Sequence, residues 1–171
     1  MRIGIFGGSF DPVHLGHLRL GEKMRKSQSL QKIYFVPVRR SPFKSKEPMA
    51  RAQDRLSMLR LTLRGKPFFK ISDCELRRSA PSYTVHTVRF FRKKFPRAGF
   101  FILMGRDALK HFRKWKDSGE IRKQCGLLPH ARFGGISSSR VRARARAGRS
   151  LKGLVAAPVE RFIRRKGLYG A

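Results

Sequence analysis

The chain of 171 residues is poor in acidic residues and cysteine, and it has no long hydrophobic run. Its two cysteines, Cys74 and Cys125, lie far apart and form no CxxC pair. We therefore expect no disulfide framework and a reducing, cytoplasmic location. The apolar run that begins at Ile3 is too short for a secretory signal. No stretch approaches the ~18 apolar residues needed to span a bilayer, so no membrane association is expected.

Acidic residues are the most depleted class. The chain has 10 Asp and Glu against 41 Lys and Arg, which gives a formal net charge of +31. A field of this sign attracts nucleotides, pyrophosphate, RNA and anionic membranes alike. The charge is therefore compatible with non-specific nucleic acid binding, and by itself it does not separate a nucleotide enzyme from an RNA-binding protein. A solvated basic surface with no dedicated partner would have the same composition.

Short apolar segments alternate with segments of helical periodicity along the chain. The predicted buried strands are Ile3–Phe6, Lys32–Pro37, Phe68–Ser72 and Phe100–Met104. The predicted helices run from Leu15 to about Ser27, from Met49 to about Leu63, from a cap at Ser82 to Pro96, from Gly105 through Trp115, and from Pro158 to Gly167. This alternation predicts an α/β fold with a doubly wound, mostly parallel sheet in one domain over residues 1–171. Ligands of such sheets bind at the carboxyl ends of the strands.

The segment 7–17, GGSFDPVHLGH, follows the first predicted strand and begins the first predicted helix. Its glycines permit a tight turn and let backbone amides approach a ligand. His14 and His17 lie three residues apart, so both imidazoles share one face of a helix N-terminus that attracts anions. The segment therefore predicts a phosphate site with two proton-bearing groups. A zinc pair is the alternative, but no third strong ligand stands out nearby, so no protein-bound metal is predicted.

This motif resembles the HxGH signature of the nucleotidyltransferase superfamily, and later segments resemble the bacterial nicotinate-nucleotide adenylyltransferases within it. Those segments are PFK at 42–44, RLSML at 55–59, ELRR at 75–78, SYT at 82–84, GRD at 105–107 and ISSSRVR at 136–142. The resemblance covers Met1 to about Trp115 and Ile136 to Tyr169. It implies a Rossmann-like nucleotidyltransferase fold. It also implies adenylyl transfer from ATP to nicotinate mononucleotide, which yields nicotinate adenine dinucleotide and pyrophosphate.

The resemblance also implies roles for individual residues of this chain. The implied catalytic group is His14, His17, Lys44 and Arg142. The implied ATP and phosphate site is Gly7, Gly8, Ser9, Phe10, Gly105, Asp107, Ser137, Ser138 and Ser139. The implied pyridine-nucleotide site is Ser82, Tyr83, Thr84 and Trp115. Mg²⁺ would arrive with ATP and be held mainly by substrate oxygens, and Arg55 would position nearby loops.

One segment departs from the family. Only about twenty residues separate Trp115 from Ile136, where family members usually carry a longer stretch with another strand and an Arg-Pro loop near the adenine. Residues 125–135, CGLLPHARFGG, have a poor strand pattern. We therefore expect a shortened region here, with part of the sheet and part of the ATP pocket wall absent, and with activity that is weak or absent.

Two other functions are open at this point. The first is a different adenylyl- or cytidylyltransferase of the superfamily, with another phosphorylated acceptor; the SYT segment together with Trp115 favours a pyridine nucleotide over this. The second is a basic RNA-binding protein of the same fold that is catalytically impaired. The net charge and the short segment favour that alternative, and a steep salt dependence of RNA binding would mark it.

Overall fold

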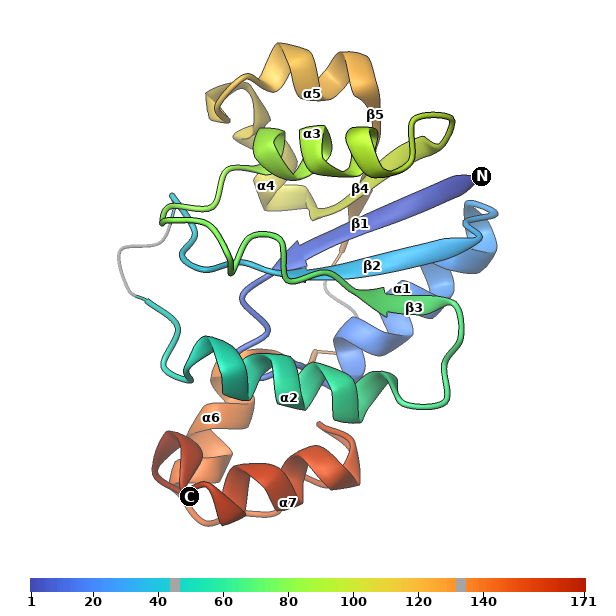
Figure 1. Cartoon of the computed structure of the whole chain (residues 1–171). Coiled ribbons are helices and arrows are strands. Elements are labelled where there is room, and N and C mark those ends of the chain that lie inside the picture. The colour runs from blue at the N-terminus through green and yellow to red at the C-terminus, as the bar shows by residue number, and fades with distance from the viewer. Residues whose placement is uncertain (44–46, 132–134) are drawn as a thin grey trace.

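The computed structural model describes residues 1–43, 47–131 and 135–171. Within these ranges, five parallel strands form one sheet in the order β3-β2-β1-β4-β5 (Figure 1). They are β1 (Arg2–Gly8), β2 (Lys32–Pro37), β3 (Phe69–Ile71), β4 (Gly99–Gly105) and β5 (Cys125–His130). The predicted parallel α/β sheet is confirmed. The strand order reverses between β1 and β4, which is where ligand crevices form in such sheets.

Helices lie on both sides of this sheet (Figure 1). One side carries α3 (Thr84–Lys94), α4 (Arg106–Lys110), the 3₁₀ helix η1 (Phe112–Lys114) and α5 (Ser118–Gln124). The other side carries α1 (Leu15–Ser27), α2 (Ala52–Leu63), α6 (Ser138–Arg146), α7 (Ala157–Arg165) and the 3₁₀ helix η2 (Leu168–Gly170). In the part of the chain that the structure describes, no helix is both long enough and apolar enough to cross a membrane.

The alternation of side chains along β1 divides the interior into two cores. Ile3 and Ile5 point toward α3 and α5 and are fully or almost fully buried there with Phe91 and Ile121. Phe6 points to the opposite side, into the core that α1, α2, α6 and α7 cover. Successive strand residues face opposite sides of a sheet, so one strand can anchor both layers. Its carboxyl end is thereby held rigidly at the edge where the glycine-rich loop begins.

The strand β5 corrects the prediction for residues 125–130, whereas residues 132–134 of that segment lie outside the described residues. Cys125–His130 pairs along its length with β4, so the prediction of a poor strand was wrong. Gly126 weakens the strand pattern in the sequence, yet a Cβ at that position would lie 2.7 Å from the ring of Phe101, so the sheet requires glycine. Pro129 is tolerated because β5 is an edge strand with one paired side.

Two predicted helix starts also differ from the structure. Ser82 does not cap α3, because its Oγ accepts a hydrogen bond of 2.9 Å from the N–H of Arg39 and the helix begins two residues later. The helix α2 begins at Ala52 instead of Met49, because the Asp11 carboxylate binds the N–H of Met49 at 2.8 Å. In both cases a contact from a distant segment occupies the group on which the prediction relied.

Candidate functional site

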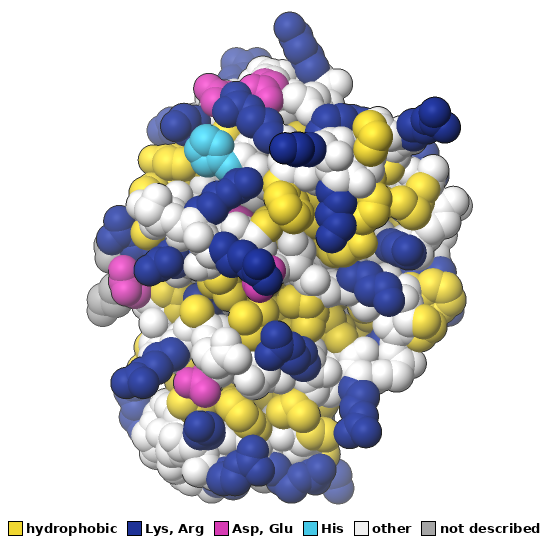
Figure 2. Space-filling model, in the orientation of Figure 1, with side chains coloured by type: hydrophobic (Ala, Val, Ile, Leu, Met, Phe, Trp, Pro, Cys, Tyr) yellow, Lys and Arg dark blue, Asp and Glu magenta, His cyan; other side chains and the backbone are white. Residues whose placement is uncertain are grey.

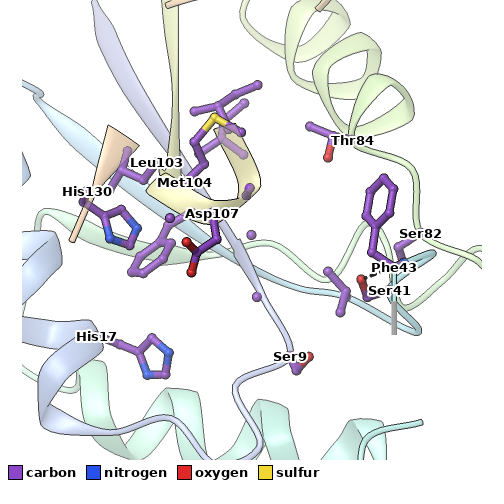
Figure 3. Close-up of a pocket in the computed structure, with 18 of the residues that line it drawn as sticks. Ser9, His17, Ser41, Phe43, Ser82, Thr84, Leu103, Met104, Asp107 and His130 are labelled. Carbon is purple, nitrogen blue, oxygen red and sulfur yellow. Dashed lines mark hydrogen bonds between the residues drawn. The ribbon is translucent and has the colours of Figure 1, made fainter. Parts of the chain in front are cut away.

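A cavity of about 1130 Å³ opens where β1 and β4 end (Figure 3). Its wall combines the ends of β1, β4 and β5 with the first residues of α1, α3, α4 and α6. The volume suits a ligand of dinucleotide size, and the edge is the one at which parallel sheets bind ligands. In Figure 3, His17 lies on one side of the cavity and Ser82, Thr84 and Phe43 lie on the opposite side, with Asp107 between them.

Most of the predicted site residues line this cavity. They are Gly7, Gly8, Ser9, His14, His17, Ser82, Tyr83, Thr84, Gly105, Asp107, Trp115, Ser137, Ser138, Ser139 and Arg142. Lys44 lies outside the described residues, so its role stays a prediction. Phe10 does not line the cavity. Its side chain is 2% exposed and packs beneath Gly8, where an added Cβ would lie 3.1 Å from the ring. Phe10 therefore supports the loop from the core.

The two motif histidines form a reciprocal cap on α1. His14 Nδ1 accepts a hydrogen bond from the N–H of His17 at 3.3 Å, and His17 Nδ1 accepts one from the N–H of His14 at 3.2 Å. The two rings stack with their centroids 3.6 Å apart. Because each Nδ1 acts as an acceptor, the neutral rings carry their proton on Nε2. The two histidines line one end of the cavity, and in their neutral form they provide two Nε2–H donors there.

Burial holds His14 in its neutral form. Its side chain is 7% exposed, and desolvation lowers the pKa of His14 to about 4. At neutral pH this histidine can donate a hydrogen bond to an anion without carrying a charge. Positive charge at this end of the cavity comes instead from Arg142, which lines it, and from the N-terminal end of the α1 dipole.

The start of α6 closes the histidine end of the cavity from a distant part of the chain. Ser137 caps the helix. The Ser138 hydroxyl donates a hydrogen bond to the Pro12 carbonyl at 2.9 Å, and Arg142 Nη1 donates to the Asp11 carbonyl at 2.6 Å. These contacts join segments that are 126 and 131 positions apart. They bring a second helix N-terminus and a guanidinium to the loop that follows β1.

Asp11 holds this loop to three other segments, a role that sequence reasoning missed. Its carboxylate accepts hydrogen bonds from the N–H of Met49 at 2.8 Å, the N–H of Ala50 at 3.0 Å and the hydroxyl of Tyr169 at 2.8 Å. Arg142 Nη1 lies 4.0 Å from the same carboxylate. An acidic residue inside a phosphate-binding motif repels phosphate unless it is engaged elsewhere, so its presence in the motif was a usable signal.

Arg55 supports the same loop from α2. Its side chain is 2% exposed, and Nη1 donates to the carbonyls of Ser9 at 2.7 Å and Val38 at 2.8 Å. The predicted loop-positioning role of Arg55 is confirmed by these two contacts.

The opposite end of the cavity is built from aromatic rings. Trp115 stacks against Phe43 with centroids 6.1 Å apart and contacts Phe112 at 5.4 Å. Lys116 Nζ lies 4.9 Å from the centroid of the Tyr83 ring. The helix predicted through Trp115 divides into α4 and η1, after which Trp115 is extended. Phe43 is 57% exposed at the mouth, and sequence reasoning gave it no role.

A buried carboxyl group, Glu75, lies in the wall near these rings. It is 6% exposed, and Thr87 donates a hydrogen bond of 2.5 Å to its Oε1. Burial raises the pKa of Glu75, and the hydroxyls of Thr87 and Ser82 and the charge of Arg78 oppose that rise. Glu75 thus connects the hydroxyl of Ser82 to that of Thr87 in α3.

In Figure 3, Asp107 lies between the two ends of the cavity, and His130 lies on the same side as His17. Asp107 is in the first turn of α4 and lines the cavity. His130 is paired opposite Gly105 at the end of β5, also lines the cavity, and was not predicted as a site residue. Desolvation lowers the pKa of His130. Over residues 1–43, 47–131 and 135–171, no group of three His, Cys, Asp or Glu side chains could hold a metal ion.

Comparison with known proteins gives consistent matches over the whole chain. A sequence model of the family described as cytidylyltransferase-like matches residues 5–144. A Thermus thermophilus protein named probable nicotinate-nucleotide adenylyltransferase is 37% identical over 187 aligned positions, which cover 99% of this chain and 100% of that protein. A protein of the same name from Geobacillus thermodenitrificans is 35% identical and is covered to 87% of its length. Because 187 aligned positions exceed 171 residues, these relatives carry segments that this chain lacks.

The fold has a counterpart among solved structures. The nicotinic acid mononucleotide adenylyltransferase of Plasmodium falciparum, solved in complex with NaAD, superposes with a TM-score of 0.78. The match covers 99% of this chain and 97% of that one at 19% sequence identity. At this identity the likeness supports the fold alone.

Proposed function

The chain belongs to the nicotinate-nucleotide adenylyltransferase family, and we propose that its cavity joins the adenylyl group of ATP to nicotinate mononucleotide. The products are nicotinate adenine dinucleotide and pyrophosphate, and the reaction is a step of NAD biosynthesis. The observation that carries this proposal is that one cavity holds the capped histidine pair and the α6 start at one end and the aromatic rings at the other. Phosphate groups and a pyridine ring require those two environments.

The reaction needs no nucleophile from the protein. A phosphate oxygen of nicotinate mononucleotide attacks the α-phosphorus of ATP, a new P–O bond forms, and the bond to the β-phosphate breaks as pyrophosphate leaves. Catalysis then consists of holding the two substrates in line and stabilising charge on the transferring phosphoryl group.

The histidine end supplies donors for that charge. The Nε2–H groups of His14 and His17 donate to the phosphate chain. Arg142, held by the Asp11 carbonyl, keeps other N–H groups of its guanidinium for the leaving pyrophosphate. Lys44 adds a flexible ammonium in this proposal. The hydroxyls and N–H groups at Ser137, Ser138 and Ser139 bind the outer phosphates at the α6 N-terminus.

Two glycines leave room for the phosphate groups along the cavity wall. An added Cβ at Gly7 or Gly105 would meet no heavy atom within 4 Å, so a side chain at either position would extend into open space along the cavity wall. Glycine at these two positions lets the backbone N–H groups come close to phosphate oxygens. Ser9 comes directly after β1 and lines the same part of the cavity with its backbone.

The aromatic end binds nicotinate mononucleotide. Trp115 stacks on the pyridine ring, and the backbone N–H groups of Tyr83 and Thr84 at the start of α3 receive its carboxylate. Ser82 is held by Arg39 and fixes the approach of the chain to that helix start. Phe43 covers the outer side of Trp115.

A magnesium ion would enter with ATP. Asp107 is the cavity carboxylate that suits it, because Glu75 is buried and bonded to Thr87. One carboxylate together with phosphate oxygens and water is the kind of donor set that Mg²⁺ prefers. The ion would neutralise charge on the phosphate chain.

The sequence predicts that this chain departs from its relatives at the ATP end. We propose that the shortened connection between Trp115 and Ile136 leaves the adenine less enclosed, with a raised KM for ATP. The alignments, which are longer than the chain, support a deletion. We also propose a cytoplasmic location, which the two free cysteines fit.

Pyrophosphate release tests the function directly. The protein is first freed of nucleic acid at high salt and then given ATP, Mg²⁺ and nicotinate mononucleotide. Nicotinamide mononucleotide and a reaction without acceptor serve as controls. Release that depends on the nicotinate acceptor supports the proposal. Release with another phosphorylated acceptor alone would point to a different transferase of the superfamily, and no release from folded protein would favour the impaired RNA-binding alternative.

A further inference from the structure

The basic surface extends far beyond the cavity. Figure 2 shows Lys and Arg side chains over the whole visible face, including the end formed by α6 and α7, with few acidic side chains between them. The formal net charge is +31. Adenylyl transfer uses only the cations that reach the cavity, so this reaction does not account for the remainder.

The acidic residues neutralise only a small part of this positive charge, because most of them are engaged with a single neighbouring Lys or Arg. All ten lie in the described ranges, and seven of them form ion pairs with a neighbouring Lys or Arg: Asp11, Glu22, Glu47, Asp73, Asp117, Glu120 and Glu160. Of the other three, Glu75 is buried, Asp107 lines the cavity, and Asp54 lies in the first turn of α2. Most surface cations are therefore available to an external anion.

The C-terminal unit, defined here as residues 138–171 with α6, α7 and η2, carries many cations and almost no acidic residues to neutralise them. It has eight arginines and two lysines against one acidic residue, Glu160, which pairs with Arg164 at 3.3 Å. The segment from α3 to α5 is also basic, but Arg89 is paired there with Asp117 and Glu120. Outside the Arg164 pair, the exposed cations of the C-terminal unit are Arg140, Arg146, Arg149, Lys152, Arg161, Arg165 and Lys166.

The unit lacks the apolar surface that a membrane-bound helix needs. Val159, Phe162 and Ile163 of α7 are buried in the core, so the helix presents its charged face to solvent. The large hydrophobic residues that are exposed in the described ranges all lie elsewhere: Met1, Phe43, Met49, Phe68 and Leu109. A helix that binds a bilayer surface inserts an apolar face, so these features favour a partner recognised by charge alone.

Arginine predominates in the unit, and its planar guanidinium group can donate two parallel hydrogen bonds to one phosphate group. Arg161 and Arg165 are four residues apart on α7 and therefore adjacent on one face. We propose that the exposed cations of the C-terminal unit, none of which lines the cavity, bind the phosphate backbone of a nucleic acid strand, without preference for base sequence, as an activity separate from adenylyl transfer. Binding of this kind releases counterions and weakens steeply with salt.

The experiment measures the fluorescence anisotropy of a labelled single-stranded RNA of about 20 nucleotides, titrated with the whole chain between about 50 and 200 mM KCl. A DNA strand of the same sequence is a second probe, and it should bind equally, because the contacts are to phosphate. The test variant replaces Arg161, Arg165 and Lys166 with Gln. None of the three lines the cavity.

The matched control replaces Lys93, Arg122 and Lys123 with Gln. These residues are exposed cations on α3 and α5, on the opposite side of the sheet from α7 (Figure 1). Both variants lose the same charge, and thermal unfolding and adenylyl transfer measured on each verify that the fold and the cavity are intact.

The α7 variant should bind RNA about tenfold or more weakly than the unaltered chain near 0.1 M salt, with a log–log salt slope flatter by about 2. The control should keep the slope of the unaltered chain. Equal losses in both variants would mean diffuse attraction and overturn the proposal. Displacement of RNA by saturating nicotinate adenine dinucleotide would place the RNA in the cavity and overturn it too. The proposal would also be overturned if the chain bound anionic lipid vesicles through the same three residues but did not bind RNA.

Discussion

The two ends of the cavity are built on different principles. At the histidine end, hydrogen bonds made by side chains hold His14, His17, Asp11 and Arg142 in place. Those that join Asp11 to Arg142 and to Tyr169 span more than a hundred positions of sequence. At the aromatic end, Trp115 rests on ring contacts and its partner Phe43 is largely exposed. The comparison indicates a preorganised end for the transferring phosphates and an adaptable end for the substrate ring.

The largest expected effect is at the histidine end. His17→Ala removes one Nε2–H donor to the phosphate chain, and kcat should fall about 10²- to 10³-fold, as for the loss of a preorganised donor. The free energy of unfolding should change by only about 1 kcal/mol, since His17 also accepts from the His14 N–H in the cap. Pyrophosphate release and urea unfolding measure the two quantities. His86→Ala, outside this cavity, is the control, and an unchanged kcat in His17→Ala would contradict the role.

The pH dependence of stability probes the same end. Burial lowers the pKa of His14 to about 4 in the folded chain, against about 6.5 in the unfolded chain. The unfolded chain therefore binds more protons between these values, so stability should rise with pH from about 4 to 6.5 and change no further from this source above 6.5. The full contribution is about 3 kcal/mol.

His14→Gln removes this titration and serves as the comparison. The difference in unfolding free energy between the two proteins, measured by urea unfolding at a series of pH values, should vary only in that window. A parallel pH dependence of both proteins would show that folding leaves the pKa of His14 unchanged, and it would contradict the burial of a neutral imidazole.

At the aromatic end the expected effect is on binding. Trp115→Ala should raise KM for nicotinate mononucleotide about tenfold, because a stacking surface is lost, and it should leave KM for ATP and the kcat nearly unchanged. Trp115→Phe should recover much of the affinity. A fall in kcat with an unaltered KM would mean that this end also orients the reacting phosphate, and the contrast between the two ends would fail.

The smallest effect is expected from Tyr169→Phe. This change removes the hydroxyl that donates to the buried Asp11 carboxylate at 2.8 Å. Unfolding free energy should fall by about 1–2 kcal/mol, with kcat reduced a few-fold because Arg142 shares Asp11. Tyr34→Phe, on the other core, is the control. A kcat that stays constant while stability falls would limit Tyr169 to a structural role.

Local patterns predicted the elements whose interactions lie close in the chain. The strand Ile3–Phe6 and the helix from Leu15 to Ser27 were predicted and are found, with the strand extended at both ends. The histidine pair follows from its spacing alone, since residues three apart share a helix face. The position of the cavity also followed, because strand and helix alternation implies a parallel sheet whose ligands bind at one edge.

The errors lie where a distant residue decides. Gly126 and Pro129 look unsuitable for a strand, but the ring of Phe101 and the position at the sheet edge make them suitable. Ser82 looks like a helix cap, but Arg39 occupies its oxygen. Phe10 belongs to the phosphate motif, but its ring is in the core.

The sequence by itself determined the chemistry of this protein: a glycine-rich loop with two histidines, serines before a basic helix, one tryptophan, and a strong positive charge. These are local properties of residue type and spacing. Only the tertiary structure decided which of these groups meet, that Asp11 joins the loop to Tyr169 near the other end of the chain, and that His14 is neutral. The physical reason is that burial and hydrogen bonds between distant segments arise only when the sheet and its two helical layers pack together.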